Sequence, residues 1–188
     1  YQTRRRETWM IPVSGAFPFY PYCMEEEVRL RDYWFMENFT RFWLAIIALE
    51  GDILFHFGNK DIRLSAGEIL FIPKNTGYSF ENGESESSHK VVLEVIGQNL
   101  NSDLETLGLN RLISVRSDRC EVLADQIRAI GDLIHLQQPS AVPELLGRTY
   151  RILVEFSDLL PEKKRTNNLL LRAQMLLESN FETRLTLP

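Results

Sequence analysis

The hydrophobic pattern of this 188-residue chain changes once, near Gly97, and this change limits the folds that the chain can adopt. Before Gly97, short aromatic and β-branched runs are separated by Gly, Asn, Asp, Pro and Ser at intervals of about ten residues, which is typical of strands joined by turns. After Gly97, apolar residues recur every three or four positions, as they do along one face of a helix. We therefore expect a β half followed by an α half.

The β half contains seven candidate strands. Gly58-Asn59 stands between two of them and indicates a hairpin. A set of short strands without a long helix between them favours a sandwich or a barrel over a parallel α/β sheet. The candidate strands are Val28 to Met36, Arg41 to Leu49, Ile53 to Phe57, Asp61 to Leu64, Ile69 to Ile72, Tyr78 to Phe80 and Lys90 to Ile96.

In the α half, the hydrophobic pattern predicts two helices, then a basic hinge, then a third helix. Pro143 suits the first turn of the second helix, and Pro161 ends it. After the third helix nothing remains to cover its apolar face, so we expect the chain to be a truncated form of a longer protein. The segments are a helix from Asp118 to Gln137, a helix from Pro143 to Leu160, the hinge 161–166, and a helix from Asn167 to about Asn180.

Charge and cysteine content exclude several classes of protein. The chain has 21 Lys and Arg against 26 Asp and Glu, and this net charge of -5 has the wrong sign for a chain that binds phosphates over its whole surface. Cys23 and Cys120 lie far apart, which suits a reducing cytoplasm. The longest apolar run, Phe42 to Leu49, is far shorter than the roughly 20 residues of a membrane helix. We expect a soluble cytoplasmic protein.

Few residues have the spacing of a catalytic or metal site. His56, His89 and His135 are scattered, and the sequence contains no GxSxG, HExxH or phosphate-binding glycine motif. We therefore expect a protein that is not an enzyme, with no catalytic residue, no metal and no cofactor. The run Glu25-Glu26-Glu27 is interpreted as a solvated charge run, and Arg4 to Arg6 as a mobile terminal arm.

The aromatic residues of the β half are more informative. Rings with a polar edge suit a pocket that stacks on a small ligand, although they also suit a filled core. Tyr78 and Phe80 alternate with Ser79 and Glu81, so both rings are expected to point inward. Glu94 stands among apolar residues of its strand, and its carboxylate is expected either to face solvent or to contact a polar ligand.

Several segments together resemble the cupin-type N-terminal domain of the AraC/XylS family of transcription regulators. They are Leu49-Glu50-Gly51, Ala66 to Pro73, Thr76 to Phe80, and Glu94 to Gly97 with Leu107-Gly108-Leu109. Asn167 to Leu187 is similar to the opening of that family's DNA-binding domain. The resemblance implies an α+β fold, a cupin-like β-barrel (double-stranded β-helix) followed by α-helices.

The resemblance also implies a function and a division of the chain. Residues 1–110 would form the effector-binding barrel, 111–160 a helical dimerisation segment, 161–166 a linker, and 167–188 the first helix of a truncated helix-turn-helix domain. A small polar effector such as a sugar would bind in the barrel and control DNA binding by the full-length C-terminal domain. A membrane partner is not expected.

The main alternative is a metal-dependent cupin enzyme, an isomerase or a dioxygenase. The cupin metal signature has two histidines one residue apart and a glutamate soon after. Here only His56 lies in the corresponding hairpin, and Tyr78 stands where the family often has histidine. These departures count against metal-dependent catalysis in this chain.

Two sets of site residues follow from the pattern and the resemblance together. Trp9 belongs to the first set because the N-terminal arm of this family can fold over the ligand. The second set lies on a helix similar to the one through which family members form homodimers, and its apolar stripe is wide enough to face both the barrel and a partner. The ligand set is Trp9, Trp34, His56, Tyr78, Phe80 and Glu94. The dimer set is Leu145, Leu146, Thr149, Ile152, Leu153 and Phe156.

Overall fold

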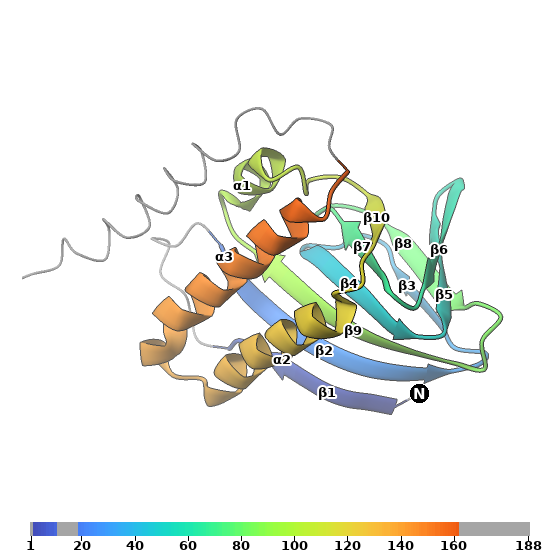
Figure 1. Cartoon of the computed structure of the whole chain (residues 1–188), viewed down its shortest axis with the longest axis horizontal. Coiled ribbons are helices and arrows are strands. Elements are labelled where there is room, and N and C mark those ends of the chain that lie inside the picture. The colour runs from blue at the N-terminus through green and yellow to red at the C-terminus, as the bar shows by residue number, and fades with distance from the viewer. Residues whose placement is uncertain (1, 11–18, 162–188) are drawn as a thin grey trace, which may run out of the picture.

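The computed structural model describes residues 2–10 and 19–161, which form ten strands, three α-helices and one short 3-10 helix. Figure 1 shows the strands gathered on one side and the helices on the other. The strands are β1 (Gln2–Thr8), β2 (Tyr20–Leu30), β3 (Trp34–Glu37), β4 (Trp43–Glu50), β5 (Asp52–Phe57), β6 (Lys60–Ser65), β7 (Glu68–Ile72), β8 (Tyr78–Asn82), β9 (Ser87–Ile96) and β10 (Ile113–Arg116). The helices are α1 (Leu100–Thr106), α2 (Cys120–Leu136), η1 (Pro139–Ala141) and α3 (Val142–Asp158).

The strands form two antiparallel sheets that face each other. One sheet has the order β1-β2-β9-β4-β7-β10, and the other has the order β3-β8-β5-β6. Within the described residues no strand ladder joins one sheet to the other, so the sheets stay open. The closed barrel expected from the sequence is therefore wrong in this respect, whereas the β half followed by helices is correct.

Two tight turns depend on glycine, one between the two sheets and one within the four-stranded sheet. Gly51 links β4 to β5 with a φ of 69°, and a methyl group there would collide with the carbonyl oxygen of Ser87. Gly58, with a φ of 61°, starts the turn between β5 and β6, where the sequence predicted a hairpin. Only glycine adopts this left-handed conformation without steric cost.

The helices pack on the outer face of the six-stranded sheet. Figure 1 shows α2 and α3 lying across this face. Gly131 of α2 allows the close approach, because a methyl group there would collide with Met24 of β2. Apolar side chains from alternate positions of β2, β4, β7 and β9 fill the interface with the helices, among them Met24, Ala45, Ile47, Phe71 and Leu93. This layer is the helix-facing core.

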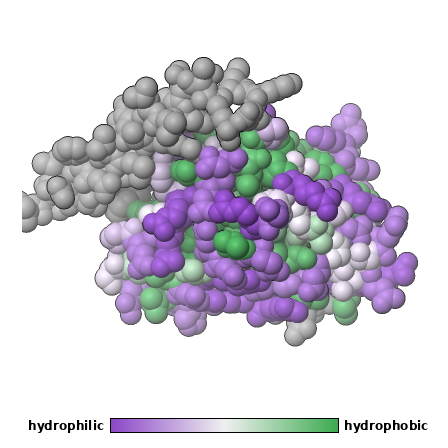
Figure 2. Space-filling model, in the orientation of Figure 1, coloured by the Kyte–Doolittle hydropathy of each residue, from purple (hydrophilic) through white to green (hydrophobic). Residues whose placement is uncertain are grey.

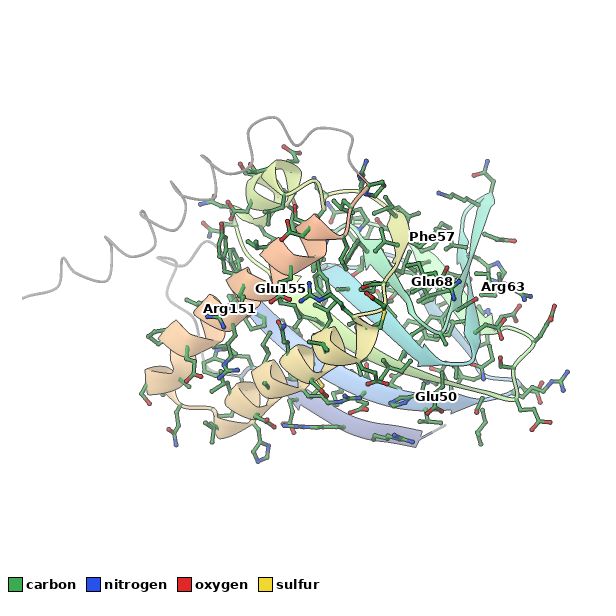
Figure 3. The ribbon with its side chains drawn as sticks, in the orientation of Figure 1. Glu50, Phe57, Arg63, Glu68, Arg151 and Glu155 are labelled. Atoms are coloured by element: carbon green, nitrogen blue, oxygen red, sulfur yellow. The ribbon has the colours of Figure 1, made fainter. Side chains whose placement is uncertain are left out.

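The inner faces of the two sheets form a second apolar layer, which we call the inter-sheet core. Strands β4, β5 and β7 supply most of it, since their buried inward positions are apolar. Its buried members include Leu44, Ile46, Phe55, Leu70 and Phe80. Figure 3 shows Phe57 and Arg63 at the β5/β6 end of the molecule, away from the helices. The inter-sheet core closes this end of the space between the sheets.

The start of the chain differs from the sequence prediction. Val28 to Met36 is not one strand, because a turn with Asp32 at a φ of 71° separates β2 from β3. Arg4 to Arg6 belong to β1 and pair with β2, so the mobile arm is also wrong. Glu25-Glu26-Glu27 lies within β2 rather than in solvent, and Glu27 is only 1% exposed.

The expected segments of the α half are matched in part. Helices α2 and α3 lie within one or two residues of the predicted ranges. The sequence did not predict α1 or β10, and β10 pairs with β7 at the edge of the larger sheet. Apart from Pro161, the linker 161–166 and the helix expected over 167–188 lie outside the described residues.

The surface over the helices is mostly polar. Figure 2 shows a largely hydrophilic face with separate, small hydrophobic areas. Within residues 2–10 and 19–161, none of the helices combines the length and the apolar content that crossing a membrane requires.

Candidate functional site

A cavity of about 400 Å³ lies between the two sheets, at the end that the inter-sheet core leaves open. This volume is at the lower end of the range found for small-molecule sites. Its walls come from β1, β2, β4 and β9 on one side and from β3, β8 and the segment 39–42 on the other. The lining residues are Arg6, Tyr22, Glu25, Glu27, Arg29, Tyr33, Phe35, Glu37, Phe39, Thr40, Arg41, Phe42, Leu44, Ile46, Tyr78, Phe80, Lys90, Val92 and Glu94.

Three charged side chains form the deepest polar part of the wall. Glu27, Arg29 and Lys90 are each no more than 4% exposed. Arg29 binds Glu27 with two hydrogen bonds, from Nε at 2.6 Å and from Nη2 at 2.5 Å. The Nζ atom of Lys90 lies 3.3 Å from Oε2 of Glu27. Because Lys90 is the register partner of Glu27 across the β2/β9 ladder, the sheet itself brings these charges together.

The pKa values of this cluster follow from burial and pairing. Burial opposes ionisation of Glu27, but the positive charge of Lys90 and the hydrogen bonds from Glu25 and Arg29 outweigh it, so its pKa is lowered. Burial lowers the pKa of Lys90, and the negative charge of Glu27 opposes that shift. A buried ion pair of this kind is costly to break, because either partner alone would be an uncompensated charge.

Two aromatic rings receive these cations on their faces. The guanidinium carbon of Arg29 lies 3.6 Å from the centre of the Tyr33 ring. The Nζ atom of Lys90 lies 3.9 Å from the centre of the Phe80 ring. Such contacts are attractive because the face of an aromatic ring carries partial negative charge.

Two further carboxyl groups, those of Glu25 and Glu94, face the cavity, and their pKa values are raised rather than lowered. Burial raises the pKa of Glu94 to about 7, while the charge of Arg6 partly opposes the shift. Burial, followed by the hydrogen bond with Glu27 and the negative charge of Glu27, raises the pKa of Glu25. Both groups therefore titrate closer to neutrality than an ordinary glutamate.

Tyr78 lies at the centre of the aromatic wall. Its ring contacts those of Phe35, Phe55 and Phe80 at centroid distances between 6.1 and 6.4 Å. Burial, and then the negative charge of Glu94, raises the pKa of its hydroxyl group. Tyr78 thus presents a neutral phenol to the cavity.

Three of the six predicted ligand residues line this cavity: Tyr78, Phe80 and Glu94. The rings of Tyr78 and Phe80 both face inward, as their alternation along β8 predicted. Glu94 faces the cavity rather than bulk solvent, because it shares a face of β9 with Lys90 and Val92.

The other three predicted residues lie elsewhere, which corrects the prediction. Trp9 is buried in the helix-facing core, on the opposite side of the larger sheet. Trp34 is 57% exposed, and it points outward from β3 because Phe35 takes the inward position. His56 lies on the outer face of β5, where its Nδ1 is 2.9 Å from Asp61 and its Nε2 is 3.6 Å from Glu81.

Sequence reasoning missed the charged residues of β2 and, on β9, Lys90, although it did predict Glu94. Glu25, Glu27 and Arg29 occupy alternate positions of β2, and Lys90 and Glu94 occupy alternate positions of β9. This period of two was a usable signal, since alternate residues of a strand share one face. It was hidden because residues 20–27 were not predicted to form a strand.

The residues predicted for the dimer interface are mostly buried within their own subunit. Leu145, Thr149, Ile152, Leu153 and Phe156 are each at most 1% exposed, and the four apolar ones belong to the helix-facing core. The hydroxyl of Thr149 donates a hydrogen bond to the Leu145 carbonyl oxygen at 2.8 Å. The stripe therefore faces its own sheet, and of the six residues only Leu146 keeps partial exposure.

The outward side of α3 is polar. Figure 3 shows Arg151 and Glu155 on this helix, and Glu155 accepts a hydrogen bond at 3.1 Å from Nε2 of Gln126 on α2.

None of the described residues that line the cavity is a histidine. His89 lies on the other face of β9, with its Nε2 2.8 Å from Glu26. Within the described part of the chain, no three His, Cys, Asp or Glu side chains are grouped so that they could hold a metal ion. Cys23 and Cys120 are both free and buried, and burial raises the pKa of each thiol to about 11.

Comparison with known proteins identifies a shared fold. No family model matches the chain, and no curated protein matches it in sequence. The AraC-like transcriptional activator CuxR is similar in structure, with a TM-score of 0.52 and 12% identity over 91% of this chain and 64% of that one. At this identity the similarity establishes the fold alone.

Two other solved structures are more distant. YhaK from Escherichia coli gives a TM-score of 0.47 at 12% identity, over 61% of this chain and about half (51%) of YhaK. An RmlC-like cupin family protein with a double-stranded β-helix fold, from Methanocaldococcus jannaschii, gives 0.38 at 13% identity, over 43% of this chain and 74% of that one.

Proposed function

We propose that this chain is the effector-binding part of an AraC-type transcription regulator and that its effector is a small polar molecule bound between the sheets. The observation that carries the proposal is the cavity of about 400 Å³, which combines aromatic rings with buried charged groups. Burying charged groups is costly, and proteins keep such costly arrangements mostly at functional sites, of which a ligand-recognition site is one kind. The similarity to CuxR in fold supports the same reading.

The sequence suggested a sugar as the effector. A sugar would stack on a ring such as Tyr78 and donate hydroxyl hydrogen bonds to carboxylates such as Glu94, both of which line the cavity. In a longer regulator, a helix-turn-helix domain after residue 167 would bind DNA and respond to the effector. The proposal includes a homodimer. Of the six residues predicted for its interface on α3, Leu146 is the one that is partly exposed.

We place ligand binding ahead of catalysis for this cavity. A metal-dependent cupin enzyme needs imidazole ligands at the site, whereas the cavity wall contains carboxyl groups and cations without a histidine.

The proposal is tested by a thermal-shift screen of sugars, amines and carboxylic acids, followed by titration calorimetry on the compound that stabilises the chain most. Tyr78→Ala removes the central ring of the cavity and is expected to weaken binding at least about tenfold. Ser79→Ala is the matched control, because Ser79 lies on the same strand outside the cavity wall. Equal affinities in the two variants, or no compound that binds, would contradict the proposal.

A further inference from the structure

The charges of the cavity wall are unevenly matched. Four glutamates line it, whereas the only two buried cations among the described lining residues are Arg29 and Lys90. Both of these cations are bound to one glutamate, Glu27. Among the described residues, the remaining carboxyl groups, those of Glu25, Glu37 and Glu94, form no ion pair with either cation, although the charge of Lys90 partly opposes the raised pKa of Glu25 and of Glu94.

The cations at the mouth of the cavity reduce this imbalance only in part. Arg6 and Arg41 line the rim and are exposed to solvent, so water competes for their charge. Among the described residues, no side chain lies within hydrogen-bond or ion-pair distance of Glu94 or Glu37. Arg6 acts on Glu94 through its charge only, and burial still dominates the state of that carboxyl group.

Aromatic rings surround the same space. Tyr22 and Phe42 stack with their centroids 4.5 Å apart, and both line the cavity together with Phe35 and Tyr78. The faces of Tyr33 and Phe80 already receive protein cations, at 3.6 and 3.9 Å. The wall thus shows on two of its own rings the contact that a bound cation would make.

We propose that the effector of this cavity is a small organic cation, a primary or quaternary ammonium carried on an apolar or aromatic body. The ammonium group would lie beside Glu94 and Glu37 against the ring of Tyr78, and the body would contact Leu44, Ile46 and Val92. This inference rests on the proposed function, because it concerns the same cavity, and it names the class of ligand.

The competing ligand classes fit the wall less well. A carboxylate or a phosphate would lie among the carboxyl groups of Glu25, Glu37 and Glu94, which form no ion pair with a buried cation of the described wall. A neutral polyol would supply hydrogen bonds but no positive charge to stabilise the ionised forms of these carboxyl groups. A cation supplies the missing counter-charge and uses the ring faces as well.

The raised pKa of Glu94 agrees with a cationic ligand. The pKa of Glu94 is raised to about 7 mainly by burial, so a fraction of the molecules carries a protonated Glu94 at neutral pH. A bound ammonium would stabilise the ionised form and lower that pKa. Binding at pH 7 should therefore release protons, which calorimetry detects as a dependence of the heat on the ionisation enthalpy of the buffer.

The test compares three probes of similar shape: benzylammonium chloride, benzyl alcohol and sodium benzoate. Each is titrated into the whole chain at pH 7.5 and constant ionic strength. We expect benzylammonium to bind at least about tenfold more tightly than benzyl alcohol, since one close charge pair contributes about this factor. Benzoate should be the weakest of the three.

Two variants assign the preference to the cavity. Glu94→Gln keeps the shape of the side chain and removes its charge, so the preference for benzylammonium should fall to about threefold or less. Glu86→Gln removes an exposed carboxylate from the loop before β9 and should leave the preference unchanged. Far-UV circular dichroism checks that both variants are folded.

The outcomes separate this inference from the proposed function. Tighter binding of benzylammonium that depends on Glu94 supports the inference. Equal binding of benzylammonium and benzyl alcohol, or preferred binding of benzoate, would overturn the inference and leave the cavity as a ligand site. If none of the three probes binds, the inference is overturned, whereas the proposed function is decided separately by the thermal-shift screen of sugars, amines and carboxylic acids.

Discussion

The two faces of the six-stranded sheet are built from the same strands, yet they contain different kinds of side chain. On the helix-facing side, β2, β4 and β9 contribute apolar residues such as Met24, Ile47 and Leu93, which are fully buried against α2 and α3. On the cavity side, the neighbouring positions of β2 and β9 hold Glu27 and Lys90 around an open space. The first face is filled as a folding core is filled, and the second keeps volume and charge that folding alone does not require.

The largest expected effect is a difference in stability loss between a substitution in the helix-facing core and one at the cavity. Phe156→Ala removes a fully buried ring from the helix-facing core and should destabilise the chain by about 3–5 kcal/mol. Phe35→Ala removes a half-buried ring that already borders the cavity, and we expect about 1–2 kcal/mol because little new void is created. Urea denaturation measures both changes, and equal losses would contradict the distinction between the faces.

The second effect concerns the ion clusters on the two faces. Glu27→Ala leaves Arg29 and Lys90 buried without their counter-charge and should cost roughly 3 kcal/mol. Glu26→Ala, on the helix-facing side, removes the contacts with His89 and Arg128, and roughly 1–2 kcal/mol is expected because Arg128 is partly exposed. The same denaturation experiment would refute the ranking if Glu26→Ala proved the more damaging change.

The third effect concerns Glu94, whose titration makes the stability of the parent chain depend on pH. Glu94 has a pKa of about 7 in the folded chain, above the usual value of 4.5, so the folded state holds more protons than the unfolded state between these values. Stability therefore falls as the pH rises from about 4.5 to 7 and stays reduced above that range.

Glu94→Gln removes the titrating group from the cavity. We expect the variant to be more stable than the parent by roughly 1–2 kcal/mol at pH 8 and nearly equal to it at pH 5. Thermal unfolding at the two pH values checks this, with Glu86→Gln as the control. A difference that is the same at both pH values would show that the carboxyl group is not buried as described.

The smallest effect on stability concerns α3. Leu146 is half-buried at the rim of the helix, whereas Thr149 is fully buried beneath it. Leu146→Glu should change the free energy of unfolding by no more than about 1 kcal/mol and should shift a homodimer to monomer in analytical ultracentrifugation. A wild-type chain that is monomeric at micromolar concentration would refute a dimer, and a variant that still sediments as a dimer would place its interface elsewhere.

The sequence predicts the elements with strong periodicity and misses those with charge runs. Helices α2 and α3 and strands β4 to β9 carry clear apolar patterns between turns, so they could be predicted. Strands β1 and β2 include Arg4 to Arg6 and Glu25 to Glu27, and consecutive charges suggest solvent. In a strand, however, consecutive side chains point to opposite faces. Glu26 therefore meets Arg128 of α2, whereas Glu25 and Glu27 enter the cavity.

The candidate site could be predicted only where alternation and residue type agreed. Tyr78 and Phe80 lie on one face of a short strand, and Glu94 is polar among apolar neighbours, so these three were found. Trp9, Trp34 and His56 have suitable chemistry, but the sequence does not show which face of the sheet they occupy. The pairing of Glu27 with Lys90 joins residues 63 positions apart and depends on the β2/β9 register, which a single sequence does not contain.

The claim that the space between the sheets is the ligand site is tested most directly by methyl NMR during a titration with benzylammonium chloride. Leu44, Ile46 and Val92 line the cavity, whereas Ile127 and Leu145 lie in the helix-facing core. The account predicts that the methyl signals of the first three residues shift with increasing probe while those of the other two stay in place. Shifts centred on Ile127 and Leu145, or no shift at all, would contradict it.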